Sequence, residues 1–165
     1  MRLSSLLLLL VLAAAPPSAP RPAQSDRSAP LFTTTSGTFF ALSVPDLDAS
    51  VAWYSAKLGL KTARTMSGPD GGRVAILEGS GLIVELVQLP KAQPLSQAAP
   101  SVRDRPYLHG IFKAGLIVDD FDAVVAGLKA RDVEIAFGPF PARDGQRANL
   151  IVRDNAGNLI QFFGK

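Results

Sequence analysis

The chain has 165 residues, of which 47% are hydrophobic and 19% charged, and it contains one histidine and no cysteine. This balance is typical of a globular protein and excludes disulfide scaffolds, thiol catalysis and metal sites built from cysteine or from two histidines. The formal net charge is +3, but from residue 30 onward 14 Lys and Arg face 13 Asp and Glu. We therefore expect no nucleic-acid partner, because such proteins carry a basic stripe.

The first 36 residues differ in composition from the rest. Arg2 is followed by an unbroken apolar run over residues 6–15, which is too short to cross a membrane because a spanning helix needs about 20 residues. The pattern predicts a signal peptide over residues 1–15, with cleavage after Ala13 or Ala15, and a secreted or periplasmic protein without a stable membrane anchor. The alternative is an uncleaved anchor helix. Residues 16–36 are rich in Pro, Ala and Ser and predict a disordered spacer.

The remainder of the chain contains an internal repeat. A shift of 74 positions aligns eight identical residues within fifteen positions. The identical pairs are Leu42/Leu116, Val44/Val118, Asp46/Asp120, Asp48/Asp122, Ala49/Ala123, Val51/Val125, Ala52/Ala126 and Ala56/Ala130. Farther along, a shift of 76 aligns residues 81–85 with 157–161. The body of the chain is therefore a duplication.

Each copy predicts one strand, one helix and three more strands. The strands are expected over 37–44, 61–67, 73–78 and 81–88 in the first copy and over 110–118, 133–138, 147–153 and 158–163 in the second. Asp46 and Asp120 stand where helix N-caps belong. The linker over 89–108 holds four prolines and is predicted to be extended. The predicted fold class is α+β, with βαβββ modules over 37–88 and 109–164 forming a cupped mixed sheet around a cleft.

Alternation along the strands predicts which face packs on the helices. The expected helix face holds Phe40, Leu42, Val44, Leu82, Val84, Leu86, Phe112, Ala114, Leu116 and Val118. The opposite face holds Phe39, Ala41, Ser43, Ile83, Glu85, Val87, Ile111, Lys113, Gly115 and Ile117, and the group Leu159, Gln161 and Phe163 shares one face. Because this second face is still largely apolar, it predicts the lining of a cleft.

Two segments carry a resemblance to a known family. Residues 39–50, with Trp53-Tyr54 and residues 58–60, resemble the opening of a vicinal oxygen chelate (VOC) domain. Residues 154–163 resemble its closing hairpin. The superfamily includes glyoxalase I, bleomycin-resistance proteins and extradiol dioxygenases, and the resemblance covers about 37–164. It implies the paired-module fold, a small-molecule ligand and a possible homodimer, whereas activity differs widely within the superfamily.

The resemblance also implies where a metal would bind. Family metal sites use the first and fourth strands of each module, and the matching positions here are Phe39, Glu85, Lys113 and Gln161. Phenylalanine cannot ligate a metal and an ammonium group repels one, so Glu85 is the only family-like ligand and Gln161 a possible second. Because a catalytic zinc site uses three protein ligands, we expect no metal and no other cofactor. His109 lies four residues before Lys113, about 13 Å along a strand.

Glu85 and Lys113 are the two charged side chains expected in the cleft. An isolated carboxylate among apolar residues is costly and needs a partner, so we expect Lys113 to pair with Glu85 or to hold a ligand as a cavity cation in place of the metal. The predicted cleft residues are Phe39, Ser43, Glu85, Lys113, Gln161 and Phe163. We expect an exported protein that binds a small organic molecule, with no catalytic residue assigned. The alternatives are a metal-dependent lyase, isomerase or dioxygenase and a scaffold that serves only protein interactions.

Overall fold

The computed structural model describes residues 37–165. The predicted signal peptide and spacer, residues 1–36, lie outside the described residues. Within residues 37–165, none of the helices has the length and apolar character needed to span a membrane.

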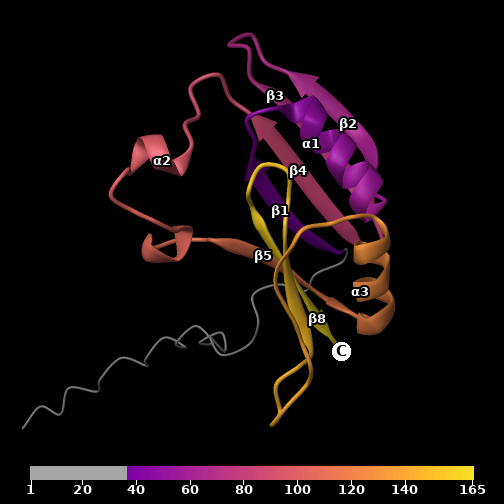
Figure 1. Ribbon diagram of the computed structural model, residues 1–165. Coiled ribbons are helices and arrows are strands. Elements are labelled where there is room, and N and C mark those ends of the chain that lie inside the picture. The colour runs from indigo at the N-terminus through magenta and orange to yellow at the C-terminus, as the bar shows by residue number, and fades with distance from the viewer. Residues whose placement is uncertain (1–36) are drawn as a thin grey trace, which may run out of the picture. The chain divides into compact units, whose positions relative to one another are not determined.

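The first module is a four-stranded mixed sheet with one helix (Figure 1). Its elements are β1 (Thr38–Ser43), α1 (Leu47–Trp53), the π-helical turn η1 (Tyr54–Leu58), β2 (Lys61–Ser67), β3 (Arg73–Gly79) and β4 (Leu82–Gln88). The strand order is β1-β4-β3-β2, in which β1 runs parallel to β4 and the other neighbours are antiparallel. Helix α1 therefore lies in the crossover that connects β1 to β2, two strands that run in the same direction.

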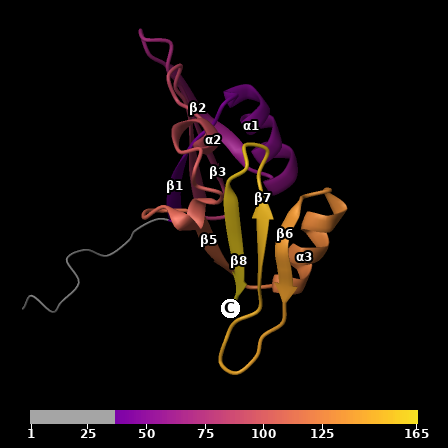
Figure 2. The same cartoon turned by 60° about the vertical axis from the view of Figure 1, so that its left-hand side comes forward.

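The second module repeats this arrangement. Its elements are β5 (Lys113–Val118), α3 (Phe121–Ala130), β6 (Ile135–Phe140), β7 (Asn149–Arg153) and β8 (Leu159–Gly164). The order is β5-β8-β7-β6, with β5 parallel to β8, and Figure 2 shows strands β8, β7 and β6 side by side. The predicted α+β class with two βαβββ modules is confirmed, with the eight strands divided between two sheets.

The duplication is preserved in the backbone register. Asp46 and Asp120 both cap their helices by accepting a hydrogen bond from the backbone three residues on. Ala41 pairs with Glu85 and Gly115 pairs with Gln161, which are the shifts of 74 and 76 seen in the sequence. Each cap satisfies a backbone N–H that the helix itself leaves without a partner.

The predicted division between the two faces of each sheet is also confirmed. Helix α1 packs on β3 and β4, helix α3 packs on β8, and both helices lie on the same side of the strands (Figure 1). The buried core is formed by Val44, Leu47, Tyr54, Leu60, Ala75, Leu77, Leu82, Val84, Leu86, Leu128, Val133, Leu150, Val152, Ile160 and Phe162. Each fully buried leucine in this cluster contributes about 1.5–3 kcal/mol relative to an exposed one.

Two segments differ from the prediction. The linker is not wholly extended, because it contains the short helix α2 (Leu95–Ala98) and the 3-10 turn η2 (Arg105–Tyr107). Strand β5 begins at Lys113 rather than at residue 110, because its partner β8 begins at the paired residue Leu159. Gly110 has a φ of 134°, a value that L side chains rarely adopt, so the extended backbone is interrupted there.

Candidate functional site

Each sheet has a second face that carries no helix, which we call the open face. Side chains of residues paired directly on neighbouring strands point to the same face. In the first module one row consists of Ala41, Glu85 and Ile76, and in the second the equivalent row consists of Gly115, Gln161 and Ile151. Glu85 and Gln161 therefore occupy equivalent central positions, as the duplication predicts.

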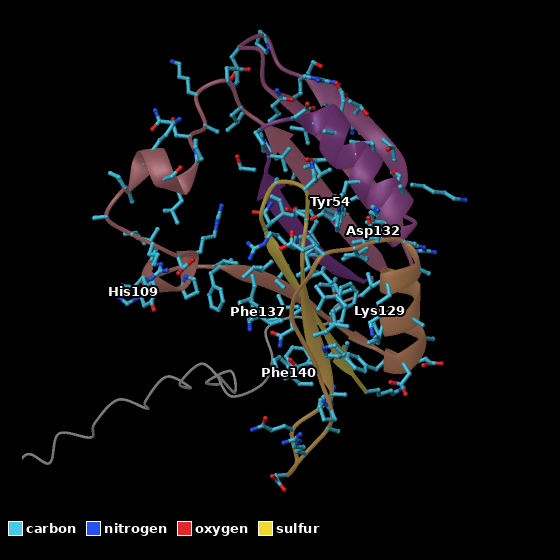
Figure 3. The ribbon with its side chains drawn as sticks, in the orientation of Figure 1. Tyr54, His109, Lys129, Asp132, Phe137 and Phe140 are labelled. Carbon is cyan, nitrogen blue, oxygen red and sulfur yellow. The ribbon has the colours of Figure 1, made fainter. Side chains whose placement is uncertain are left out.

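Large apolar side chains are exposed on the open face. Phe39 is 57% exposed and Ile117 63% exposed. Phe137 and Phe140 of β6, marked in Figure 3, are exposed by about half and pair with Ile151 and with Asn149. Sequence reasoning missed these two phenylalanines, because the register of β6 shifts on both sides of Phe137 and simple alternation from Ile135 does not place them on this face. Exposed phenylalanine and isoleucine side chains therefore occur on the open faces of both sheets, where they offer apolar surface to a ligand.

A cavity of about 210 Å³ lies between β1 and β5. Two predicted cleft residues, Ser43 and Lys113, line it together with Ala41. Arg105 of the linker also lines it, and sequence reasoning missed this second cation because nothing in the linker indicates where it folds back. The Lys113 ammonium nitrogen lies 5.3 Å from the centre of the Phe112 ring, a distance at which a cation is attracted to the aromatic face.

The other four predicted residues do not line this cavity. Phe39 stands exposed near the start of β1, and Glu85 and Phe163 are half-buried. Gln161 is buried, and its side-chain nitrogen donates a 3.0 Å hydrogen bond to the side-chain oxygen of Asn149. The structure thus brings Ser43 and Lys113 together and leaves the other predicted residues elsewhere on the two sheets.

The expected ion pair between Glu85 and Lys113 is not formed. The ion pairs within residues 37–165 are Arg73–Asp48, Arg153–Glu134 and Lys165–Asp119. Glu85 lies between Ala41 and Ile76 in its own sheet, whereas Lys113 is at the beginning of β5 in the other. Glu85 is only half-buried, so its carboxylate does not need the partner that a fully buried charge would require.

The residues at the four family metal positions do not fit a metal centre. No group of three His, Cys, Asp or Glu side chains suited to a metal occurs in the described part of the chain. Phe39 offers no donor atom, Lys113 is a cation, and the Gln161 amide is already bonded to Asn149. His109 is exposed in the segment before β5, outside the sheet (Figure 3). Glu85 alone cannot provide the three protein ligands of a catalytic site.

A buried hydrogen bond joins the first module to the second. Tyr54, with no exposed surface, donates a 2.9 Å hydrogen bond from its hydroxyl to Oδ2 of Asp154. Burial, and then the negative charge of Asp154, raise the pKa of Tyr54 far above its usual value, so the hydroxyl stays protonated and keeps donating. Asp154 also accepts hydrogen bonds from Ala156 and from the backbone and side chain of Asn158. Because Tyr54 belongs to the first module and Asp154 to the second, this hydrogen bond joins the two modules.

Comparisons with known proteins agree with this architecture. Residues 38–162 match the model of the Glyoxalase/Bleomycin resistance protein/Dioxygenase superfamily. Among solved structures, the antibiotic-binding protein TnmS3 from Streptomyces sp. CB03234 is 21% identical, with 81% of this chain and 98% of that chain covered and a TM-score of 0.56. A glyoxalase family protein from Enterococcus faecalis is 16% identical, with coverages of 80% and 98% and a TM-score of 0.62.

A third structure is an enzyme. The trypanothione-dependent glyoxalase I of Leishmania major is 23% identical, with coverages of 76% and 84% and a TM-score of 0.53. Likenesses at this level of identity establish the fold and leave the ligand open. None of the curated proteins matches the chain significantly.

Proposed function

Because this chain belongs to the Glyoxalase/Bleomycin resistance protein/Dioxygenase superfamily, we propose that it binds a small organic molecule at its open faces without the family metal. One observation carries the proposal: among the four residues at the family metal positions, only Glu85 is a good metal ligand. The fold supports binding as well as catalysis, and a protein of the same fold is described as antibiotic-binding.

The exposed side chains of the open faces and the cations of the cavity between β1 and β5 support one class of ligand. Phe39, Ile117 and Phe137 offer exposed apolar surface, which an aromatic or aliphatic body would cover. Lys113 and Arg105 line the cavity between β1 and β5 and favour a carboxylate, sulfonate or carbonyl group there. The proposed ligand is therefore an apolar molecule with one anionic or carbonyl group, and the proposed site spans both modules of one chain. A homodimer stays a prediction.

Independence from metal is the first prediction. The melting temperature of the protein is expected to be unchanged by a chelator and by added Ni²⁺, Zn²⁺, Mn²⁺ or Fe²⁺. An ion that does not bind the folded protein cannot stabilise it. Metal analysis of the purified protein is expected to find no stoichiometric ion. A stoichiometric metal, or a rise in melting temperature on metal addition, would instead favour a metal-dependent lyase, isomerase or dioxygenase.

Export is the second part of the proposal. The apolar run over residues 6–15 after Arg2 supports a cleaved signal peptide. When the full chain is expressed in a bacterium, intact-mass measurement is expected to find a mature protein that begins after Ala13 or Ala15, outside the cytoplasm. Recovery of only the uncleaved chain with the membrane fraction would identify the segment as an anchor.

A further inference from the structure

The duplication creates two equivalent places where the helix of one module meets the strands of the other. The hydrogen bond between Tyr54 and Asp154 is made at only one of them. The strand registers make Gly79 the equivalent of Asp154, because each follows three residues after the equivalent isoleucines Ile76 and Ile151. The shift of 74 along the helices makes Leu128 the equivalent of Tyr54. The hydrogen-bonded Tyr54–Asp154 pair therefore corresponds to a leucine and a glycine that cannot form it.

Neighbouring positions show the same loss of bulk or polarity. Gly127 stands in the place of Trp53, Val124 in the place of Ser50, and Ser80 alone replaces the Asn155-Ala156 pair. On the first side the Asn155 side chain donates a 3.1 Å hydrogen bond to the Ser50 hydroxyl. On the second side neither partner of that hydrogen bond is present.

A cavity of about 570 Å³ occupies the place of the missing contact. Its lining includes Gly79, Ser80, Val124, Gly127 and Leu128, the very positions at which the two sides differ. A methyl group added at Gly127 would meet no atom within 4 Å, so the space extends to the surface of α3. The volume lies within the range of about 300–1,000 Å³ found for small-molecule sites.

The cavity lining is mainly apolar, and the charged side chains in it already have partners. Its walls include Leu58, Leu60, Leu82, Leu116, Val124 and Leu128. Lys57 donates to the backbone carbonyls of Arg131 and Asp132, and Arg131 donates back to the carbonyl of Lys57. Asp119 pairs with Lys165, and Asp120 caps α3. A charged ligand would have to displace these partners, whereas a neutral one would only cover apolar surface.

We infer that this cavity, which lies between the β3–β4 turn and α3, is a second binding site for a neutral, compact, apolar molecule of the size of a fused aromatic ring system. Most of the lining comes from α3 and from the β3–β4 turn, and the cavity includes one residue of the open faces, Ile117 at the end of β5. It stands independently of the proposed function, because it rests on the difference between the two modules.

Titration of the full chain with indole, a neutral bicyclic probe, tests the inference by methyl NMR. The Val124 and Leu128 methyl signals are expected to shift saturably in the unmodified protein. Gly127→Phe is expected to weaken indole binding at least tenfold, because the ring fills the cavity. Ala126→Phe, which adds the same ring one position away at an exposed residue of α3, is expected to bind as the unmodified protein does.

A second variant that fills the cavity keeps the test decisive if the first variant does not fold. Val124→Phe enlarges a side chain that already faces the cavity, and it decides the matter if Gly127→Phe does not fold. The inference is overturned if the Val124 and Leu128 signals do not move, or if the folded filling variants keep the original affinity. Saturable shifts confined to Ile76, Ile83 and Ile151 would also overturn it, while leaving the open-face proposal intact.

Discussion

Replacing Asp154 by alanine is expected to lower the free energy of unfolding by about 3–5 kcal/mol, the largest effect of any single substitution proposed for this chain, because four donors lose their acceptor. Asp154 is 4% exposed, and its carboxylate accepts hydrogen bonds from the Tyr54 hydroxyl, from two backbone N–H groups and from the Asn158 amide. Each buried donor that loses its acceptor costs about 1–3 kcal/mol, less where water enters the vacated space. Urea denaturation followed by circular dichroism measures the change.

Two further variants identify the origin of that effect. Tyr54→Phe removes one of the four donors and is expected to cost about 1.5–3 kcal/mol, the usual value for a hydrogen bond to a charged group. Asp122→Ala removes an exposed acid from the first turn of α3 and is expected to cost less than about 1 kcal/mol. If Asp154→Ala proved no more destabilising than Asp122→Ala, the contact would not be what joins the modules.

Replacing Lys113 by methionine is expected to weaken binding of an anionic aromatic probe, 8-anilinonaphthalene-1-sulfonate, by about tenfold to hundredfold. The Lys113 side chain lines the cavity between β1 and β5, and a hydrogen bond to a charged group contributes about 1.5–3 kcal/mol. Methionine keeps much of the length and apolar stem of lysine while removing the charge. Fluorescence titration of the dye measures the affinity.

The matched control is Lys129→Met. Lys129 is exposed on α3, on the helix side of the molecule (Figure 3), so its loss changes the net charge equally without touching the proposed site. It is expected to alter the dye affinity by less than twofold at 0.15 M salt, where exposed charges are largely screened beyond about 8 Å. Unchanged affinity in Lys113→Met would contradict the role of Lys113 as a cavity cation.

Much of the fold follows from short-range patterns in the sequence. The helix caps at Asp46 and Asp120 lie within three residues of the backbone groups that they bind, so a local motif identifies them. The period of two along the strands assigned Val84 and Leu86 to the helix face, and both side chains are fully buried. The shift of 74 then required both halves to share one architecture.

The candidate site was predictable only in part. The four equivalent positions follow from the duplication, and the register of Glu85 and Gln161 agrees with it. Their surroundings could not be deduced, because they depend on how the edge strands β1 and β5 approach each other and on where the linker returns. Arg105 reaches the cavity through that linker. The expected ion pair is not formed, because Glu85 lies in the middle of its sheet whereas Lys113 lies at the beginning of the edge strand β5.

Periodicity and capping act over a few residues, so the duplication, the order of elements and the buried face of each strand can all be deduced from the amino-acid sequence. How the two halves differ depends instead on contacts between distant residues. The hydrogen bond from Tyr54 to Asp154 joins residues 100 positions apart. The equivalent residues, Leu128 and Gly79, carry no sequence signal of a cavity, and only the tertiary structure shows that they line one. Because protein interiors are closely packed, replacing a tyrosine and an aspartate by a leucine and a glycine is enough to leave a cavity where the other contact is filled.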